Sequence, residues 1–125
     1  MYHRDLDLWK TSIELVKVVY GVLDGFPRNE EYALSSQIRR AAVSIPSNIA
    51  EGCGRGTNKE LYRFLDIASG SPAELETQIY IAKELGYISD SSEVDDLIVT
   101  VQKILVGFKK RIKTEILKNN QDCAI

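Results

Sequence analysis

The side chains of this 125-residue chain that could carry out catalysis are few and far apart. The single histidine, His3, stands near the N-terminus, so the chain cannot supply the paired Glu-x-x-His ligands of a metal centre in a helical bundle. The serines at positions 44, 47, 69 and 71 have no histidine partner, and a serine nucleophile needs an oriented base. We therefore expect no catalytic residue, no metal site, no cofactor and no enzyme activity.

Lys and Arg side chains are better candidates for a functional site than these serines and the histidine. They can bind the phosphates of a nucleic acid and release the counterions condensed on those phosphates. The net charge of the chain is −2, so its composition does not favour a nucleic-acid binder, and such a function would have to come from a local patch. The candidate RNA-binding residues are Arg55, Lys59, Arg63, Lys109, Lys110, Arg111, Lys113, Arg39 and Arg40.

A glycine-rich stretch, Glu51–Thr57, leads into a predicted helix start and invites comparison with a phosphate-binding loop. It lacks the Gly-Lys-Ser/Thr ending of a P-loop, and no strand precedes it. Two interpretations stay open: a flexible turn between two helices, or an anion contact made by Arg55 and the neighbouring backbone amides.

Four segments with apolar residues three and four positions apart predict four helices. The first has apolar rows from Leu6 to Phe26, with Asp7 as the expected N-cap and Gly25 and Pro27 as the end signal. The fourth opens among Asp90, Ser92 and Glu93, and its apolar stripe continues to Ile112.

The second and third helices each contain a proline, which removes a backbone donor and disfavours straight helical geometry. The second runs from about Glu30 to Gly52 around Pro46, and we expect one kinked helix rather than two short ones. We expect Ser44, Ser47 and Asn48 to satisfy the freed backbone groups.

The third helix begins at the capping box Thr57-Asn58-Lys59-Glu60, bends near Pro72 and ends at Gly86. Short connections between the four segments make them antiparallel neighbours. The predicted fold is therefore an all-α, antiparallel up-down-up-down four-helix bundle with proline-kinked second and third helices. It occupies residues 1–118, and residues 119–125 form a frayed C-terminal tail.

This topology separates the charges into two ends of the bundle. Residues 1–7, 51–63 and 108–125 share one end and carry nine bases and six acids, a net +3. Residues 21–34 and 83–97 share the other and carry two bases and eight acids, a net −6. The basic end is either a phosphate-docking face or the ordinary matching of charges to helix dipoles. Arg39 and Arg40 lie farther along the bundle and would form a separate contact, although Arg39 could as easily pair within the bundle or an oligomer.

The cysteines and apolar runs bear on the cellular compartment. Cys53 and Cys123 have no CxxC spacing, and we expect no structural disulfide. The N-terminal residues are too charged for the apolar part of a signal peptide, and no apolar run approaches the roughly 20 residues of a membrane span. These features favour a cytoplasmic protein without membrane contact.

Several motifs are distinctive: Gln37–Gly52 with its Ser-Ile-Pro-Ser-Asn core, Asp7-Leu-Trp9, Phe26-Pro27, Phe64-Leu65, Gly70-Ser71 and Glu74–Gln78. Together they closely resemble the bacterial four-helix-bundle family also called the 23S rRNA intervening-sequence protein family. The resemblance covers roughly residues 5–90 in motifs and the whole chain in layout. Pro72 departs from the family pattern, which more often has an ordinary helix former there.

The resemblance implies a small cytosolic bacterial protein that forms a ring-shaped homo-oligomer, with a pentamer as the expected state. Some members are encoded in insertions within large-subunit rRNA genes. A distantly similar bundle is the accessory subunit of a reverse transcriptase and contacts RNA there. Two functional hypotheses follow: a non-enzymatic oligomer that binds rRNA or another structured RNA through its basic end, or a scaffold whose partner is a protein. The second would use the Ala41-Ala42 region and the apolar rows of the first helix for contacts.

Overall fold

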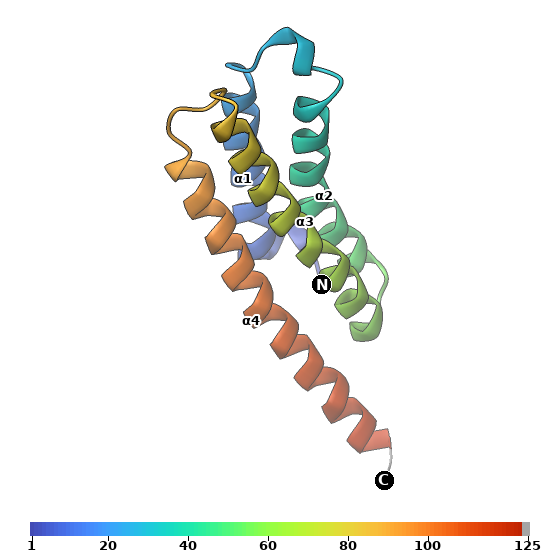
Figure 1. The fold of residues 1–125 in the computed structure, drawn as a ribbon. Helices are drawn as coiled ribbons and strands as arrows, with labels where there is room; N and C mark the ends of the chain where they lie inside the picture. The colour runs from blue at the N-terminus through green and yellow to red at the C-terminus, as the bar shows by residue number, and fades with distance from the viewer. Residues whose placement is uncertain (124–125) are drawn as a thin grey trace.

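The computed structural model describes residues 1–123, and that part of the chain is helical throughout except for short connections. The helices are α1 (Asp7–Leu23), α2 (Leu34–Gly54), α3 (Asn58–Glu84) and α4 (Ser92–Cys123), with short 3-10 turns η1 (His3–Asp5) and η2 (Arg28–Glu30). The chain runs up α1, down α2, up α3 and down α4 (Figure 1). Each helix packs against its two neighbours in the order α1, α2, α3, α4 and back to α1. The predicted four-helix bundle is confirmed.

The core lies along the bundle axis, where all four helices contribute their apolar stripes. The fully buried large side chains are Leu8, Leu15, Ile38, Ile45, Ile49, Leu65, Leu75, Ile79, Ile98, Ile112, Val19 and Val94. In α1 the side chains of Leu8, Leu15 and Val19 face the axis, whereas Tyr20 is 45% exposed. Ala41 and Ala42 are buried in the same core, so the expectation that they serve partner contacts is wrong.

Two helix starts differ from their sequence-based positions. Leu6, in an extended conformation, is the N-cap of α1, and Asp7 is already the first helical residue. The second helix begins at Leu34 rather than near Glu30, because the residues around Glu30 form the 3-10 turn η2. A 3-10 turn uses the same local apolar and acidic residues as a helix start, which is why spacing alone did not separate them.

The start of α3 confirms the predicted capping residue. Thr57 is extended, and its Oγ1 accepts a hydrogen bond of 3.2 Å from the backbone amide of Glu60. The side chain of Glu60 accepts from Arg63. Hence Thr57 satisfies an amide that has no partner within the helix.

We expect Thr57→Ala to lower the free energy of unfolding by about 1 kcal/mol, the usual cost of losing an N-cap. Thr77→Ala is the matched control, because the Thr77 hydroxyl only donates to the Ala73 carbonyl within the same helix. Urea denaturation of both variants measures the difference, and equal losses would show that the cap contributes nothing specific.

The end of α3 is closed by Gly86, which has a φ of +81° that side chains with a Cβ rarely adopt. The Gly86 amide donates to the Lys83 carbonyl, and the Tyr87 amide donates to the Ala82 carbonyl at 2.9 Å. This pair of bonds is a Schellman motif, so the predicted glycine end is confirmed. Tyr87 then packs against Phe26, with ring centres 5.3 Å apart, and joins the two upper connections.

Both prolines lie inside uninterrupted helices, Pro46 in α2 and Pro72 in α3, which excludes two short helices in place of the second. Around Pro46 the side chains of Ser44, Ser47 and Asn48 donate to the carbonyls of Ala41, Val43 and Ser44 respectively. None of these bonds reaches the Ala42 carbonyl, the one that Pro46 leaves without a helical donor, so the expectation that they satisfy it is wrong. The kinks at the two prolines stay predictions.

The fourth helix is much longer than the first. Its 32 residues correspond to about 48 Å, against about 26 Å for the 17 residues of α1. Its last turns therefore extend beyond the other three helices (Figure 1). The predicted frayed tail from residue 119 falls on helix up to Cys123, and residues 124–125 lie outside the described residues. None of the helices described has the length and apolar character needed to cross a bilayer.

Candidate nucleic-acid interface

The structure places the nine candidate cations in three groups. Arg55, Lys59 and Arg63 lie around the turn between α2 and α3 at the lower end of the bundle. Lys109, Lys110, Arg111 and Lys113 lie on the lower half of α4. Arg39 and Arg40 lie in the upper half of α2, away from the other two groups.

The two arginines of the first group stack on one aromatic ring. The guanidinium carbons of Arg55 and Arg63 lie 5.1 and 4.6 Å from the centre of the buried Phe64 ring. Each arginine also has its own carboxylate: Arg55 bonds Glu51 at 2.8 Å, and Arg63 bonds Glu60 at 2.7 Å. The hydrogen bond from Arg63 lowers the pKa of Glu60 below its usual range. Their carboxylate partners therefore partly neutralise these two cations, so each arginine attracts a phosphate less strongly.

Lys109 joins α4 to α3. Its Nζ forms an ion pair with Asp66 and lies 5.5 Å from the centre of the Tyr62 ring. Only 22% of the Lys109 side chain is exposed. This lysine acts as a structural contact in the bundle rather than as a cation available to solvent.

Beyond Lys109 the candidate cations of α4 have no carboxylate partner among the described residues. Within the described part of the chain, Lys110, Arg111 and Lys113 form no ion pair, and each is exposed. Arg111 lies over Phe108, with its guanidinium carbon 5.5 Å from the ring centre. Lys59, at the start of α3, also forms no ion pair with another described residue. Apart from Lys59, the unpaired candidate cations at the lower end of the bundle are thus Lys110, Arg111 and Lys113 of α4.

The two arginines of α2 have different surroundings. Arg39 donates to both the carboxylate and the backbone carbonyl of Glu31, so it fastens the start of α2 to the preceding turn. Arg40 is exposed and borders two shallow hollows, one toward α1 and one toward α3. Neither residue lies next to the cations of α4.

The glycine-rich stretch is mostly helix. The second helix continues through Gly54, so the predicted flexible turn over residues 51–57 is wrong for its first half. The turn itself is short, with Gly56 at a φ of +87°. Since Arg55 pairs with Glu51 and Thr57 occupies the Glu60 amide, two of the groups that a phosphate would use already have partners.

The serines at positions 44, 47, 69 and 71 form hydrogen bonds within the bundle, and the Cys53 thiol is buried. Ser44 and Ser71 share a hydrogen bond of 2.6 Å between α2 and α3, and Ser69 donates to the Leu65 carbonyl. Burial raises the pKa of the Cys53 thiol, which keeps it protonated and unreactive. Among the side chains that the structure describes, no group of three or more His, Cys, Asp or Glu residues is arranged to hold a metal ion.

Sequence reasoning missed a groove between the N-terminal segment and α4. It is a hollow of about 410 Å³ bordered by Asp5 and Asp7 on one side and by Lys103, Gly107 and Arg111 of α4 on the other. No spacing rule connects residues 5–8 with residues 103–111, because only the bundle brings them together.

By its fold, this protein is a small antiparallel four-helix bundle. Its fourth helix is the longest and carries exposed cations. The model of the 23S rRNA-intervening sequence protein family matches residues 4–107, and the chain belongs to this family. No curated protein matches the chain. The exposed cations of α4 from Lys110 onward follow the matched region.

Proposed function

We propose that this protein is a non-enzymatic RNA-binding oligomer of the bacterial cytoplasm, and that it binds rRNA or another structured RNA through the exposed cations in the lower half of α4. The observation that carries the proposal is the contrast among the candidate cations. Arg55, Arg63 and Lys109 have carboxylate partners, whereas Lys110, Arg111 and Lys113 are exposed without one in the described chain.

Oligomerisation would strengthen this interface without any new contact. In a cyclic ring, such as the pentamer expected from the family resemblance, all subunits point the same way. Each copy of α4 would then present its cations on one face of the ring, and simultaneous contacts with one RNA would raise the overall affinity. A native mass measurement of the purified protein tests the ring directly, and a monomer at micromolar concentration would contradict it.

The RNA-binding test compares two triple charge reversals. We expect Lys110→Glu, Arg111→Glu and Lys113→Glu together to weaken binding of rRNA fragments about equally for all sequences. The slope of log affinity against log salt concentration should fall by about 2 to 3, roughly 0.7 to 0.9 for each phosphate that the variant no longer neutralises. The matched control reverses Lys17, Arg28 and Lys83, three exposed bases outside the lower half of α4.

Filter binding or fluorescence anisotropy across a range of salt concentrations provides both measurements. Equal loss in the two triple variants would mean that net charge alone governs binding. A wild-type protein that binds no RNA at low salt would overturn the proposal.

The alternative is a protein-interaction scaffold, and one surface feature favours it. A groove of about 400 Å³ between α3 and α4 at the acidic end has apolar walls that include the exposed side chains of Tyr80 and Val99. Affinity capture before and after nuclease treatment separates the two functions, since a protein partner retained after nuclease treatment would favour the scaffold.

A further inference from the structure

The groove between the N-terminal segment and α4 is lined by both apolar and charged side chains. Its walls are the apolar side chains of Leu6, Leu8, Ile104 and Phe108, and its rim carries Asp5, Asp7, Lys103 and Arg111. A hollow of about 410 Å³ is large enough for one nucleobase and most of its sugar. It lies where the cation-bearing part of α4 begins, on the face of the helix that carries Lys103 and Arg111.

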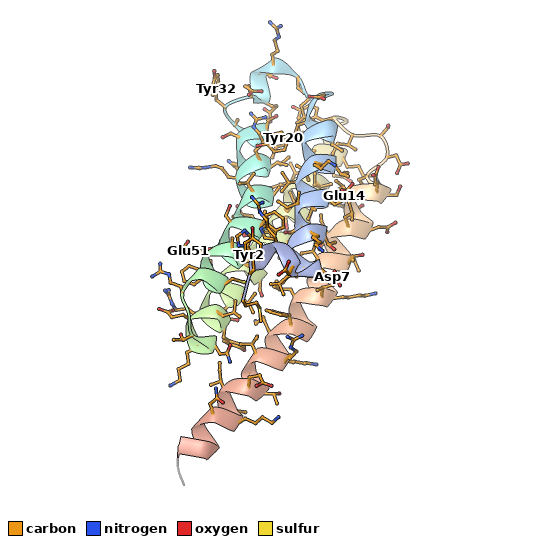
Figure 2. All side chains as sticks on the ribbon, turned by 180° about the vertical axis from the view of Figure 1, so that it is seen from behind. Tyr2, Asp7, Glu14, Tyr20, Tyr32 and Glu51 are labelled. Carbon is orange, nitrogen blue, oxygen red and sulfur yellow. The ribbon has the colours of Figure 1, made fainter. Side chains whose placement is uncertain are left out.

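Its two sides are held in place by different parts of the fold. On the N-terminal side, the rings of Tyr2 and His3, and of His3 and Trp9, pack edge to face with centres 5.2 and 5.1 Å apart. The Asp5 amide also bonds the Tyr2 carbonyl, which completes the turn that carries Asp5. In Figure 2, Tyr2 lies on the α2 side of α1 and Asp7 on the side that meets α4.

The α4 side is open because of a glycine. Nothing lies within 4 Å of the position that a Cβ would occupy at Gly107, although glycine in the middle of a helix costs about 1 kcal/mol relative to alanine. A side chain at this position would project into open space at the groove. The Phe108 ring flanks the same stretch with the exposed Arg111 guanidinium over it, and a planar base can stack on that guanidinium.

The charges at the rim are opposite in sign yet unpaired. Among the described residues, neither Asp5 nor Asp7 forms an ion pair, and the same holds for Lys103 and Arg111. Lys103 and Arg111 are eight residues apart, about 12 Å along the helix. This separation places one cation near each end of the groove, where the phosphates on either side of a bound base would lie.

We infer that this groove binds an unpaired guanine next to its phosphate, and the inference rests on the proposed RNA-binding function. A carboxylate presents two acceptor oxygens and no donor. Guanine is the base whose Watson–Crick edge offers two adjacent donors, the N1–H and the exocyclic amino group, so it can bond both oxygens of one aspartate. Adenine, cytosine and uracil each offer a single donor group on that edge and cannot form the paired bonds.

The test measures the affinity of the full chain for four short single-stranded RNAs that differ only at one central base, G, A, C or U, in a uridine background. Free guanosine monophosphate is the fifth probe. We expect the guanine RNA to bind about tenfold or more tightly than the other three, as one paired hydrogen-bond contact provides. The preference should disappear in the double variant Asp5→Asn, Asp7→Asn and in Gly107→Leu.

Matched controls keep the interpretation specific. Asp24→Asn removes an exposed carboxylate at the other end of α1, and Gly70→Leu adds a side chain at an exposed glycine of α3 that also has nothing within 4 Å. Both should retain the guanine preference. Circular dichroism checks that all four variants are folded.

Each outcome is decisive. Equal, salt-dependent affinity for all four RNAs would overturn the guanine site and leave the proposed function standing. Binding of the free nucleotide as tightly as the guanine RNA, with the same loss in the variants, would support the site with a free nucleotide as its source. No binding of either the RNAs or the nucleotide would overturn the site, while binding of structured rRNA fragments tests the function separately.

Discussion

Gly52→Ala should lower the free energy of unfolding by about 1–3 kcal/mol, although alanine favours helices over glycine. A Cβ at Gly52 would lie 2.8 Å from the Cβ of Phe64 and 3.1 Å from a methyl carbon of Leu61. The nearer atom is the first carbon of its side chain and cannot rotate away, so α2 and α3 must separate to accept the methyl group.

The matched variant Gly70→Ala should have the opposite sign. Gly70 also lies inside a helix, but nothing is within 4 Å of its Cβ position, so alanine there should raise the free energy of unfolding by about 0.5–1 kcal/mol. Urea denaturation of the two variants at equal protein concentration measures both changes. Stabilisation of both would show that the close approach of α2 and α3 at Gly52 is not required.

Leu65→Ala should destabilise the protein by about 2–5 kcal/mol, the cost of emptying a leucine-sized space in a packed core. Leu65 is fully buried in α3, with 0% exposure, in the core shared by all four helices. Because this loss approaches the whole stability of a typical small domain, the variant should unfold at a much lower urea concentration.

Leu117→Ala is its control, because it removes the same atoms from the extension of α4, where Leu117 is 54% exposed. We expect a change within about 0.5 kcal/mol. A large loss at Leu117 would mean that the extension packs against another copy of the chain, and it would show as a dependence on protein concentration.

The helices could be predicted because their signals are local. The 3-4 spacing, the Thr57 cap and Gly86 each act within a few residues, and each is confirmed. The start of α2 was wrong because a 3-10 turn and a helix start are hard to distinguish in sequence. Asp7 was a reasonable cap by residue type, but the extended Leu6 takes that position.

The candidate site was less predictable because it depends on pairing. The sequence counts Arg63 and Lys110 as equal charges, yet Glu60 binds the first and no described residue binds the second. Lys109 shows the same limit more clearly, since its partner Asp66 is 43 positions away and meets it only when α3 and α4 pack. The groove that joins Asp5 to Gly107 has no sequence signal for the same reason.

The overlong α4 has a consequence for how its end behaves. Lys110 and Lys113 are three residues apart on one helix, so their like charges repel and weaken the helix. Few tertiary contacts oppose this, because most side chains from Lys113 to Asn119 are exposed. A bound polyanion would cancel the repulsion, and the backbone amides of these turns should then exchange their hydrogens with solvent more slowly. The end of α4 would thus be a segment whose helical order depends on its ligand.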